Sequence, residues 1–390
     1  MLAVLSARFS DQPQRWAVVP AAFMGVSGLL MVVFGSSAQR VLSWVWPPAL
    51  LVLVVWMTVR SHQQLGSRSR RWLLYPVFAA LLLAAVGGGY ETLGEAADAR
   101  AHPMPGELID IGGHSLHLRC TGSGSPTVVL EPGGGLMSSA LGWVAPAVAD
   151  HSQVCVYDRA GRGWSEPADT PQDATQIATD LHMLLDRGNV PGPYVLAGHS
   201  FGGLYVLTFA ARYPDEVAGM VLVDSTAPAL AAKPEATSSG EERSYNIMGR
   251  VSALVSSSAR FGLGRLIAQL DYGSLPPQSR DEARASAATA RDVQSTIDEY
   301  LQATASMEEA AALVDFADKP LVVLTAGSGS DAAWVTAQDD LATLSPNSVH
   351  RVIDGADHAG LLRDEQGAAA TTQAILDVLA SIRNEEPLAG

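Results

Sequence analysis

Residues 193–203 read Pro-Tyr-Val-Leu-Ala-Gly-His-Ser-Phe-Gly-Gly, and this stretch decides the fold class. A short apolar run leads into Gly198-x-Ser200-x-Gly202, and a second apolar stretch, 204–211, follows. This order predicts a strand, a sharp turn and a helix, with the serine hydroxyl exposed at the turn. Glycines are needed on both sides because a side chain there would collide with the neighbouring strand or helix. The pattern alone is weak in a chain with 36 glycines, so its meaning depends on its surroundings.

A serine hydroxyl becomes a strong nucleophile when a base removes its proton, and that base is typically a histidine oriented by a carboxylate. His358 follows an apolar run near the C-terminus, in the turn Gly-Ala-Asp-His-Ala-Gly over 355–360. We therefore select His358 as the base. His199 adjoins Ser200 but points elsewhere on such a turn, so we expect it to have a structural role.

Two aspartates are candidates for the carboxylate. Asp331 follows one predicted strand, in Gly-Ser-Gly-Ser-Asp over 327–331, and Asp224 ends the preceding predicted strand. Either position opens at the carboxyl edge of a parallel sheet, where such sites are built. We favour Asp331 and keep Asp224 as the alternative, because an aspartate at a strand end is also a common turn former or helix cap.

The attacked carbonyl oxygen gains negative charge and needs fixed N–H donors, which form an oxyanion hole. One expected donor is the amide of Phe201, the residue after the nucleophile. The other is expected from the glycines at 133–135, which follow the apolar run 127–130. We favour Gly134, with Gly133 beside it, because glycine lets a substrate approach the main chain. The alternative is a plain glycine turn.

Beyond residue 105, short apolar strands alternate with helical stretches. This alternation predicts an α/β fold with a mainly parallel sheet that is covered by helices on both faces. The predicted strands are 106–111, 115–120, 127–130, 153–157, 194–197, 219–223, 321–325 and 349–353.

The alternation also divides the chain. Residues 227–316 contain no clear strand and have helical spacing, so we expect a helical cap inserted between the sixth and seventh strands. The core then comprises 106–226 and 317–390, with a linker over 95–105. An all-α transmembrane region is expected over 1–94.

Three uncharged segments, 16–35, 41–59 and 72–90, support this membrane region. About 20 helical residues cross a hydrocarbon core of about 30 Å. Tryptophans near the segment ends are typical of interfacial anchors. Pro47 and Pro48 lie inside the second segment, so two spans with an interfacial piece are the alternative.

Arginines predict the orientation of this region, because basic residues favour the cytoplasmic side of a membrane. Four arginines crowd the loop between the second and third segments, and two precede the first segment, whereas only one lies between the first two. We therefore expect a multi-pass protein of the cell membrane whose core domain lies on the extracytoplasmic side. The arginines are Arg60, Arg68, Arg70 and Arg71, then Arg8 and Arg15, and finally Arg40.

Charge and cysteine content exclude other classes of protein. Residues 1–100 carry a net charge of +4, and residues 101–390 carry −19. Such an acidic body would repel phosphates, so we expect no nucleic-acid partner. The two cysteines have no metal-binding spacing, and we expect neither a metal nor an organic cofactor. The sequence gives no indication of the oligomeric state.

Taken together, residues 106–385 resemble the α/β-hydrolase superfamily, in its esterase/lipase-like branch with a helical cap. The order Ser…Asp…His along the chain is that of this superfamily. The resemblance rests on Leu-Glu-Pro-Gly-Gly-Gly at 130–135, Tyr-Asp-Arg-Ala-Gly-Arg-Gly-Trp-Ser at 157–165, Gly-His-Ser-Phe-Gly-Gly at 198–203, Leu-Val-Asp at 222–224 and Gly-Ala-Asp-His at 355–358.

The resemblance implies a mostly parallel eight-stranded sheet and a serine hydrolase that cleaves a small ester or similar acyl compound through an acyl-enzyme. An aminopeptidase, an amidase or an acyltransferase could use the same site, and a membrane scaffold on a vestigial hydrolase fold is the non-enzymatic alternative. Many members have a shorter spacing after the seventh strand than Gly327 to Asp331, which keeps Asp224 open. The family's strand order also sets Cys120 near Cys155, where the two could form a disulfide outside the cytoplasm.

Overall fold

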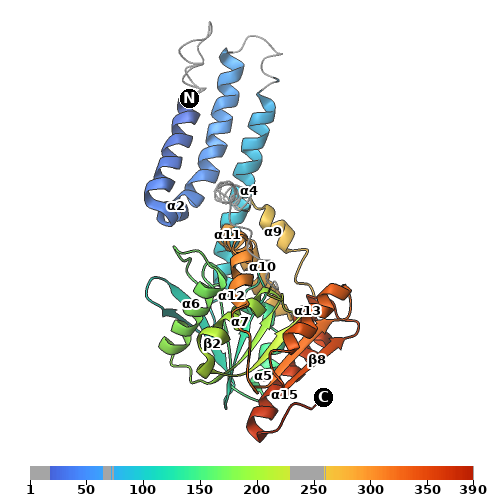
Figure 1. Cartoon of the computed structure of the whole chain (residues 1–390). Coiled ribbons are helices and arrows are strands. Elements are labelled where there is room, and N and C mark those ends of the chain that lie inside the picture. The colour runs from blue at the N-terminus through green and yellow to red at the C-terminus, as the bar shows by residue number, and fades with distance from the viewer. Residues whose placement is uncertain (1–17, 65–71, 73, 229–258, 260, 390) are drawn as a thin grey trace, which may run out of the picture. The chain divides into compact units, whose positions relative to one another are not determined.

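A computed structural model of the chain describes residues 18–64, 72, 74–228, 259 and 261–389 (Figure 1). The contacts divide the chain into two compact units. The first comprises Met1–Ala101 with Ser257–Arg265, and the second comprises His102–Ser256 with Leu266–Gly390.

The first unit contains the long helices α2 (Val18–Gln64) and α4 (Tyr75–Ala101), which pack against one another around Val54, Met57 and Phe78. Among the residues that the structure describes, two stretches are long and apolar enough to cross a membrane: Val41–Gln63 within α2, and α4 itself. The first predicted span appears as a shorter apolar helical stretch, Val18–Leu30, and its residues 16 and 17 lie outside the described part of the chain.

The predicted linker over 95–105 is helical up to Ala101, where α4 ends, and the division between the two units falls after the same residue. Residues 91–101 are rich in Ala and Glu, which have high helix propensity, so the helix extends beyond its apolar part. The unit also includes the start of α9 (Leu263–Ala268), which lies in the predicted cap. Arg265 of α9 joins α4 through ion pairs to Glu91 at 3.2 Å and to Asp98 at 2.5 Å.

The second unit is built on an eight-stranded sheet with the order β1-β2-β4-β3-β5-β6-β7-β8. β1 and β2 pair antiparallel, as do β2 and β4, and every other neighbouring pair is parallel. The predicted mostly parallel eight-stranded sheet is therefore confirmed. The strands are β1 (Glu107–Asp110), β2 (Ser115–Thr121), β3 (Thr127–Glu131), β4 (Val154–Tyr157), β5 (Tyr194–His199), β6 (Val217–Val223), β7 (Leu321–Ala326) and β8 (Ser348–Ile353).

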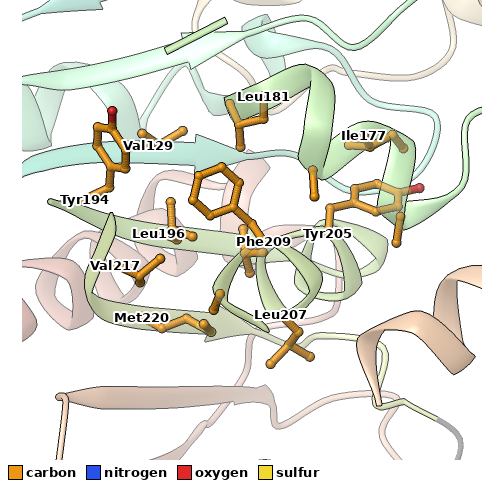
Figure 2. Close-up of a cluster of buried hydrophobic side chains, with 14 of the residues drawn as sticks. Val129, Ile177, Leu181, Tyr194, Leu196, Tyr205, Leu207, Phe209, Val217 and Met220 are labelled. Atoms are coloured by element: carbon orange, nitrogen blue, oxygen red, sulfur yellow. The ribbon is translucent and has the colours of Figure 1, made fainter. Parts of the chain in front are cut away.

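Helices cover both faces of this sheet because its central strands are apolar on both sides. Successive strand residues point to opposite faces, so Val129 and Leu196 join one buried cluster while Val128 and Val195 join the other. Figure 2 shows the first cluster, where Phe209 of α7 packs against the sheet. The covering helices include α6 (Ala174–Arg187), α7 (Phe201–Arg212) and α13 (Ala332–Ala342) on that face, and α5 (Val144–Ala149) and α15 (Glu365–Asn384) on the other.

In the predicted cap, the described residues after 258 form helices and no strand. Residues 229–258 lie outside the described part of the chain. After α9 come α10 (Pro277–Ala287), α11 (Ala290–Leu301) and α12 (Ala303–Ala310). The remaining short helices are η2 (Ser138–Leu141), η3 (Pro214–Glu216) and α14 (Gly360–Arg363).

Cys120 on β2 and Cys155 on β4 are joined by a disulfide bond. The two residues stand directly opposite one another in the antiparallel ladder between these strands. The structure thus contains the disulfide that the family resemblance made possible.

Candidate active site

Ser200 occupies the sharp turn between β5, which ends at His199, and α7, which begins at Phe201. Its φ of 54° and ψ of −124° lie in a region that non-glycine residues rarely adopt. The strand–turn–helix predicted from the sequence is confirmed. The Ser200 amide donates to Val223 O at 3.1 Å, which fixes the turn against the end of β6.

The glycines on either side of Ser200 are required by close backbone contacts. A Cβ on Gly198 would lie 2.5 Å from Gly202 O, and a Cβ on Gly202 would lie 2.5 Å from Glu131 O. Real Cβ atoms do not approach a carbonyl oxygen so closely. Both glycines therefore allow the strand, the turn and the first helical turn to pack together.

His358 lies in the loop after β8 and is bound to Asp224, which directly follows β6. The distance from Asp224 Oδ2 to His358 Nδ1 is 2.6 Å. The other carboxylate oxygen accepts from Trp334 Nε1 at 2.7 Å and from the Ala326 amide at 3.2 Å. Burial alone would raise the pKa of Asp224, but these hydrogen bonds from His358, Trp334 and Ala326 hold it below its ordinary value.

The preference for Asp331 as the partner of His358 is therefore corrected to Asp224. Asp331 is exposed and caps α13, where its side chain accepts from the Trp334 amide at 2.8 Å. The loop after β7 is long enough to carry Asp331 into the N-cap position, which aspartate favours. Asp224 stays at the strand end, beside His358.

His199 joins the elbow, which is the sharp turn at Ser200, to the loop that carries His358. Its buried ring lies 4.6 Å from the His358 ring, measured between centroids, and its Nε2 lies 2.8 Å from His358 O. A carbonyl only accepts, so Nε2 must carry the proton. Burial, followed by the nearby His358, lowers the pKa of His199 to about 3. These contacts agree with the structural role expected for this residue.

The predicted oxyanion loop, which contains the glycines at 133–135, lies against the elbow. A Cβ on Gly133 would lie 3.1 Å from Ser200 Cβ, and one on Gly134 would lie 3.1 Å from Phe201 Cδ2. The structure therefore brings Gly133 and Gly134 beside Ser200 and Phe201. A side chain at either position would crowd Ser200 or the Phe201 ring, so glycine favours this close approach of the loop.

Sequence reasoning missed residues that contact this site, among them Trp334 and Glu299. Trp334 donates to Asp224, and Glu299 of α11 accepts from the Gly135 amide at 2.9 Å. Glu299 is buried, although it stands in a helix rich in charged and polar residues that reads as a solvent-facing surface. No local sequence signal distinguishes it from its neighbours.

Within the described residues, no group of three or more His, Cys, Asp or Glu side chains could hold a metal ion. The site consists of a half-buried serine in a sharp turn, a histidine–aspartate pair and a glycine loop. These are the parts of a nucleophilic acyl-transfer site.

A family model for the alpha/beta hydrolase fold matches residues 126–364 of the chain. The chain belongs to this family. The matched range runs from β3 through the loop that carries His358, so it contains every candidate catalytic residue.

The matches between this alpha/beta hydrolase and its curated relatives cover only part of each relative. An uncharacterized protein of Schizosaccharomyces pombe is 30% identical over 232 residues, which are 57% of this chain and 41% of the relative. A 2-(acetamidomethylene)succinate hydrolase of Mesorhizobium japonicum is 31% identical over 131 residues, which are 34% of this chain and 46% of the relative. The chain thus spans less than half the length of these two relatives.

Solved structures share the alpha/beta hydrolase fold at low identity. The epoxide hydrolase CorEH has a TM-score of 0.56 and 21% identity, over 71% of this chain and 99% of that one. A thermophilic esterase from Thermogutta terrifontis has a TM-score of 0.52 and 23% identity, over 71% of this chain and 98% of that one. At such identities the likeness establishes the fold alone.

Proposed function

We propose that this chain is a serine hydrolase that cleaves an ester or a closely related acyl compound. The observation that carries the proposal is the bond between His358 Nδ1 and Asp224 beside the Ser200 elbow. Hydrolases among the curated relatives support the same class of reaction.

In the first step, Ser200 Oγ attacks the substrate carbonyl carbon while His358 takes its proton. Asp224 binds Nδ1 and stabilises the imidazolium, so Nε2 is the nitrogen that acts as the base. The Phe201 and Gly134 amides hold the developing oxyanion. His358 then returns the proton to the leaving alcohol, which departs and leaves an acyl-Ser200 ester.

In the second step, His358 removes a proton from water, and the resulting hydroxide attacks the acyl-enzyme. The carboxylic acid leaves and Ser200 recovers its proton. A serine at position 200 argues against epoxide and haloalkane hydrolysis, because those reactions use a carboxylate nucleophile. An amide substrate, or an alcohol in place of water, would follow the same steps and is distinguished only by the substrate tested.

The test combines labelling and turnover. The wild-type protein is expected to react with a fluorophosphonate probe and to hydrolyse p-nitrophenyl esters, whereas Ser200→Ala does neither, with a loss of turnover of about a millionfold. A panel of esters and aminoacyl amides then separates an esterase from an amidase or aminopeptidase. A wild-type protein that fails to label would support a vestigial scaffold instead.

We further propose that the N-terminal region anchors this hydrolase in the cell membrane with its catalytic unit on the extracytoplasmic side. Two helices of sufficient length and apolarity support the anchor, and the arginine distribution supports the orientation. A reporter fused after Gly390 that is active only outside the cytoplasm is the expected result. Activity only inside the cytoplasm would reverse the orientation.

A further inference from the structure

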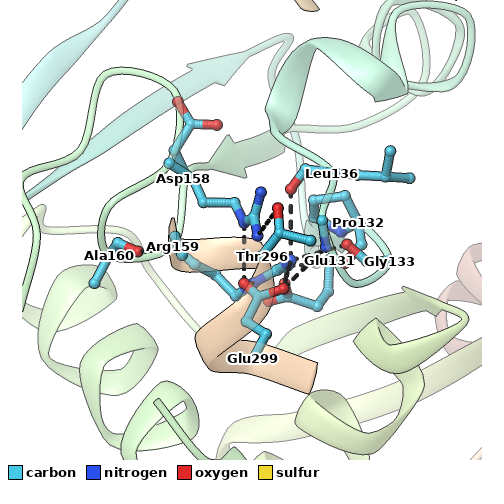
Figure 3. Close-up of polar contacts among 12 residues, drawn as sticks. Glu131, Pro132, Gly133, Leu136, Asp158, Arg159, Ala160, Thr296 and Glu299 are labelled. Carbon is cyan, nitrogen blue, oxygen red and sulfur yellow. Dashed lines mark hydrogen bonds and ion pairs between the residues drawn. The ribbon is translucent and has the colours of Figure 1, made fainter. Parts of the chain in front are cut away.

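A buried cluster of charged side chains joins cap helix α11 to the oxyanion loop (Figure 3). Glu299 of α11 accepts from Arg159 Nε at 2.8 Å and from Arg162 Nε at 3.0 Å through one carboxylate oxygen. Its other oxygen accepts from the Gly135 amide at 2.9 Å. A residue of the cap therefore binds the main chain of the loop beside Ser200.

Arg159 grips the same loop from its carbonyl side. Its Nη1 and Nη2 donate to Pro132 O and Gly133 O, each at 2.8 Å, and Nη2 also lies 3.4 Å from Leu136 O. In a planar trans peptide, the carbonyl of one residue and the N–H of the next point in opposite directions. Because Gly133 O points to Arg159, the Gly134 N–H points away from Arg159. The arginine thus sets the direction of the proposed oxyanion donor.

The position of Arg159 depends in turn on acidic partners. Its side chain is buried between Glu131, with which it forms an ion pair, and Glu299 (Figure 3). Tyr157 donates to the same Glu131 carboxylate. Burial raises the pKa of Glu131 to about 7, whereas Arg159 and Arg162 outweigh the burial of Glu299 and lower its pKa to about 2. Glu299 is therefore the partner that stays ionised across the neutral range.

We propose that Glu299 is a positioning residue for catalysis, which holds Arg159 and the Gly135 amide so that the Gly134 N–H faces the oxyanion. The proposal rests on the serine hydrolase function proposed above. It makes α11 part of the catalytic framework as well as part of the cap, so the seating of the cap and the alignment of the oxyanion hole are coupled.

The coupling predicts a change in turnover more than in substrate binding, because an oxyanion donor acts mainly on the transition state. Glu299→Gln keeps the size of the side chain but removes its charge. We expect kcat for a p-nitrophenyl ester to fall about tenfold to a hundredfold with KM changed less than about threefold. Loss of a single oxyanion donor has effects of about a hundredfold or more, and Glu299 acts on the donor indirectly.

Asp298→Asn is the matched control. Asp298 is the preceding residue of α11, is half-buried, and bonds to Gln294 of its own helix. This variant removes a charge from the same helix without touching the loop, so its kcat is expected to match that of the wild type.

Counting active sites distinguishes a purely structural role of Glu299 from a positioning role in catalysis. Each variant is labelled to completion with the fluorophosphonate probe, and kcat is expressed per labelled site. Misfolding lowers the number of sites and leaves kcat per site unchanged, whereas misalignment lowers kcat per site. If Glu299→Gln fails to fold, Glu299→Asp keeps the charge and withdraws it by one methylene, and a fall in kcat per site is again expected.

The outcomes are distinct. Wild-type protein that neither labels nor turns over would contradict the proposed function itself. Active wild-type protein together with an unchanged kcat per site in the folded Glu299 variant would contradict the positioning role alone. Equal losses in the Glu299 and Asp298 variants would also contradict it.

Discussion

Asp224 Oδ2 lies 2.6 Å from His358 Nδ1, although 134 residues separate the two along the chain. Asp224 follows β6, His358 follows β8, and β7 stands between these strands in the sheet. The contact therefore crosses one whole strand at the carboxyl edge of the sheet. It also decides between two aspartates that look equivalent in sequence.

Replacing Asp224 should lower catalysis, whereas replacing Asp331 should lower only the stability of the fold. Asp224→Asn removes the carboxylate that orients His358, so kcat should fall by about ten-thousandfold with the fold intact. Asp331→Ala removes a helix cap, so the free energy of unfolding should fall by about 1 kcal/mol while kcat stays near the wild-type value. Ester hydrolysis and urea denaturation measure the two effects. A larger loss of kcat in the Asp331 variant would contradict the assignment.

Trp334→Phe should weaken catalysis without removing any catalytic group. The indole N–H donates to Asp224 at 2.7 Å, and phenylalanine fills much of the same space without a donor. A hydrogen bond to a charged group contributes about 1.5–3 kcal/mol, so we expect kcat to fall about tenfold to a hundredfold. The pKa of Asp224 should rise at the same time, because one bond to its charged form is lost. A variant with wild-type kcat would show that the bond does not support the pair.

His199 should make the protein sensitive to acid. Its pKa is lowered to about 3 in the folded state, against about 6.5 in an unfolded chain. Between these values the unfolded chain binds a proton that the folded chain does not, so the free energy of unfolding falls as the pH falls from about 6.5 towards 3. The loss attributable to this ring amounts to up to about 4 kcal/mol.

The test is His199→Gln, because a glutamine amide can still donate to His358 O but does not titrate. Chemical denaturation at pH 7 and pH 4 measures the difference in the free energy of unfolding. We expect a smaller difference for the variant than for the wild type. Equal differences in the two proteins would contradict a buried neutral His199.

Gly202→Ala should disturb the oxyanion loop, because the new methyl group would collide with the main chain at the start of this loop. The new Cβ would lie 2.5 Å from Glu131 O and 2.8 Å from Pro132 O, and neither backbone atom can move without the loop. We expect kcat to fall at least about tenfold, in the range caused by the loss of one oxyanion donor. Gly113→Ala is the control, because its Cβ would meet nothing within 4 Å. Equal kcat values for the two variants would contradict the tight contact.

Removing the disulfide should lower stability without altering the site. Cys120 and Cys155 are 35 residues apart, and closing a loop of that length stabilises a fold by about 3–4 kcal/mol in the chain-entropy model. The double variant with alanine at both positions should unfold at lower denaturant and keep the wild-type kcat per labelled site. An unchanged denaturation midpoint would show that the bond does not contribute to the stability of the protein in solution.

Much of the fold could be predicted because its signals are local. The buried strands are short apolar runs, and β5 and β7 are each followed by a turn and a helix that nearby residues specify. The elbow at Ser200 needs glycine on both sides, and the five consecutive residues 198–202 contain both glycines. The helix α4 continues into the predicted linker as far as Ala101, because Ala and Glu after Tyr90 favour a helix whether or not the segment is apolar.

The succession of strands along the chain, the serine elbow, His358 and the glycine loop were predictable from the sequence itself, since each depends on residues close together in the chain. The partner of His358 and the burial of Glu299 were decided only by the tertiary structure. An aspartate after a strand has the same local appearance whether it caps a helix or binds a histidine. The sequence around Glu299 is that of a polar helix and likewise predicts an exposed side chain. Only the fold places Arg159 and Arg162 beside it. Both outcomes depend on contacts between residues more than a hundred positions apart, which local sequence patterns do not encode.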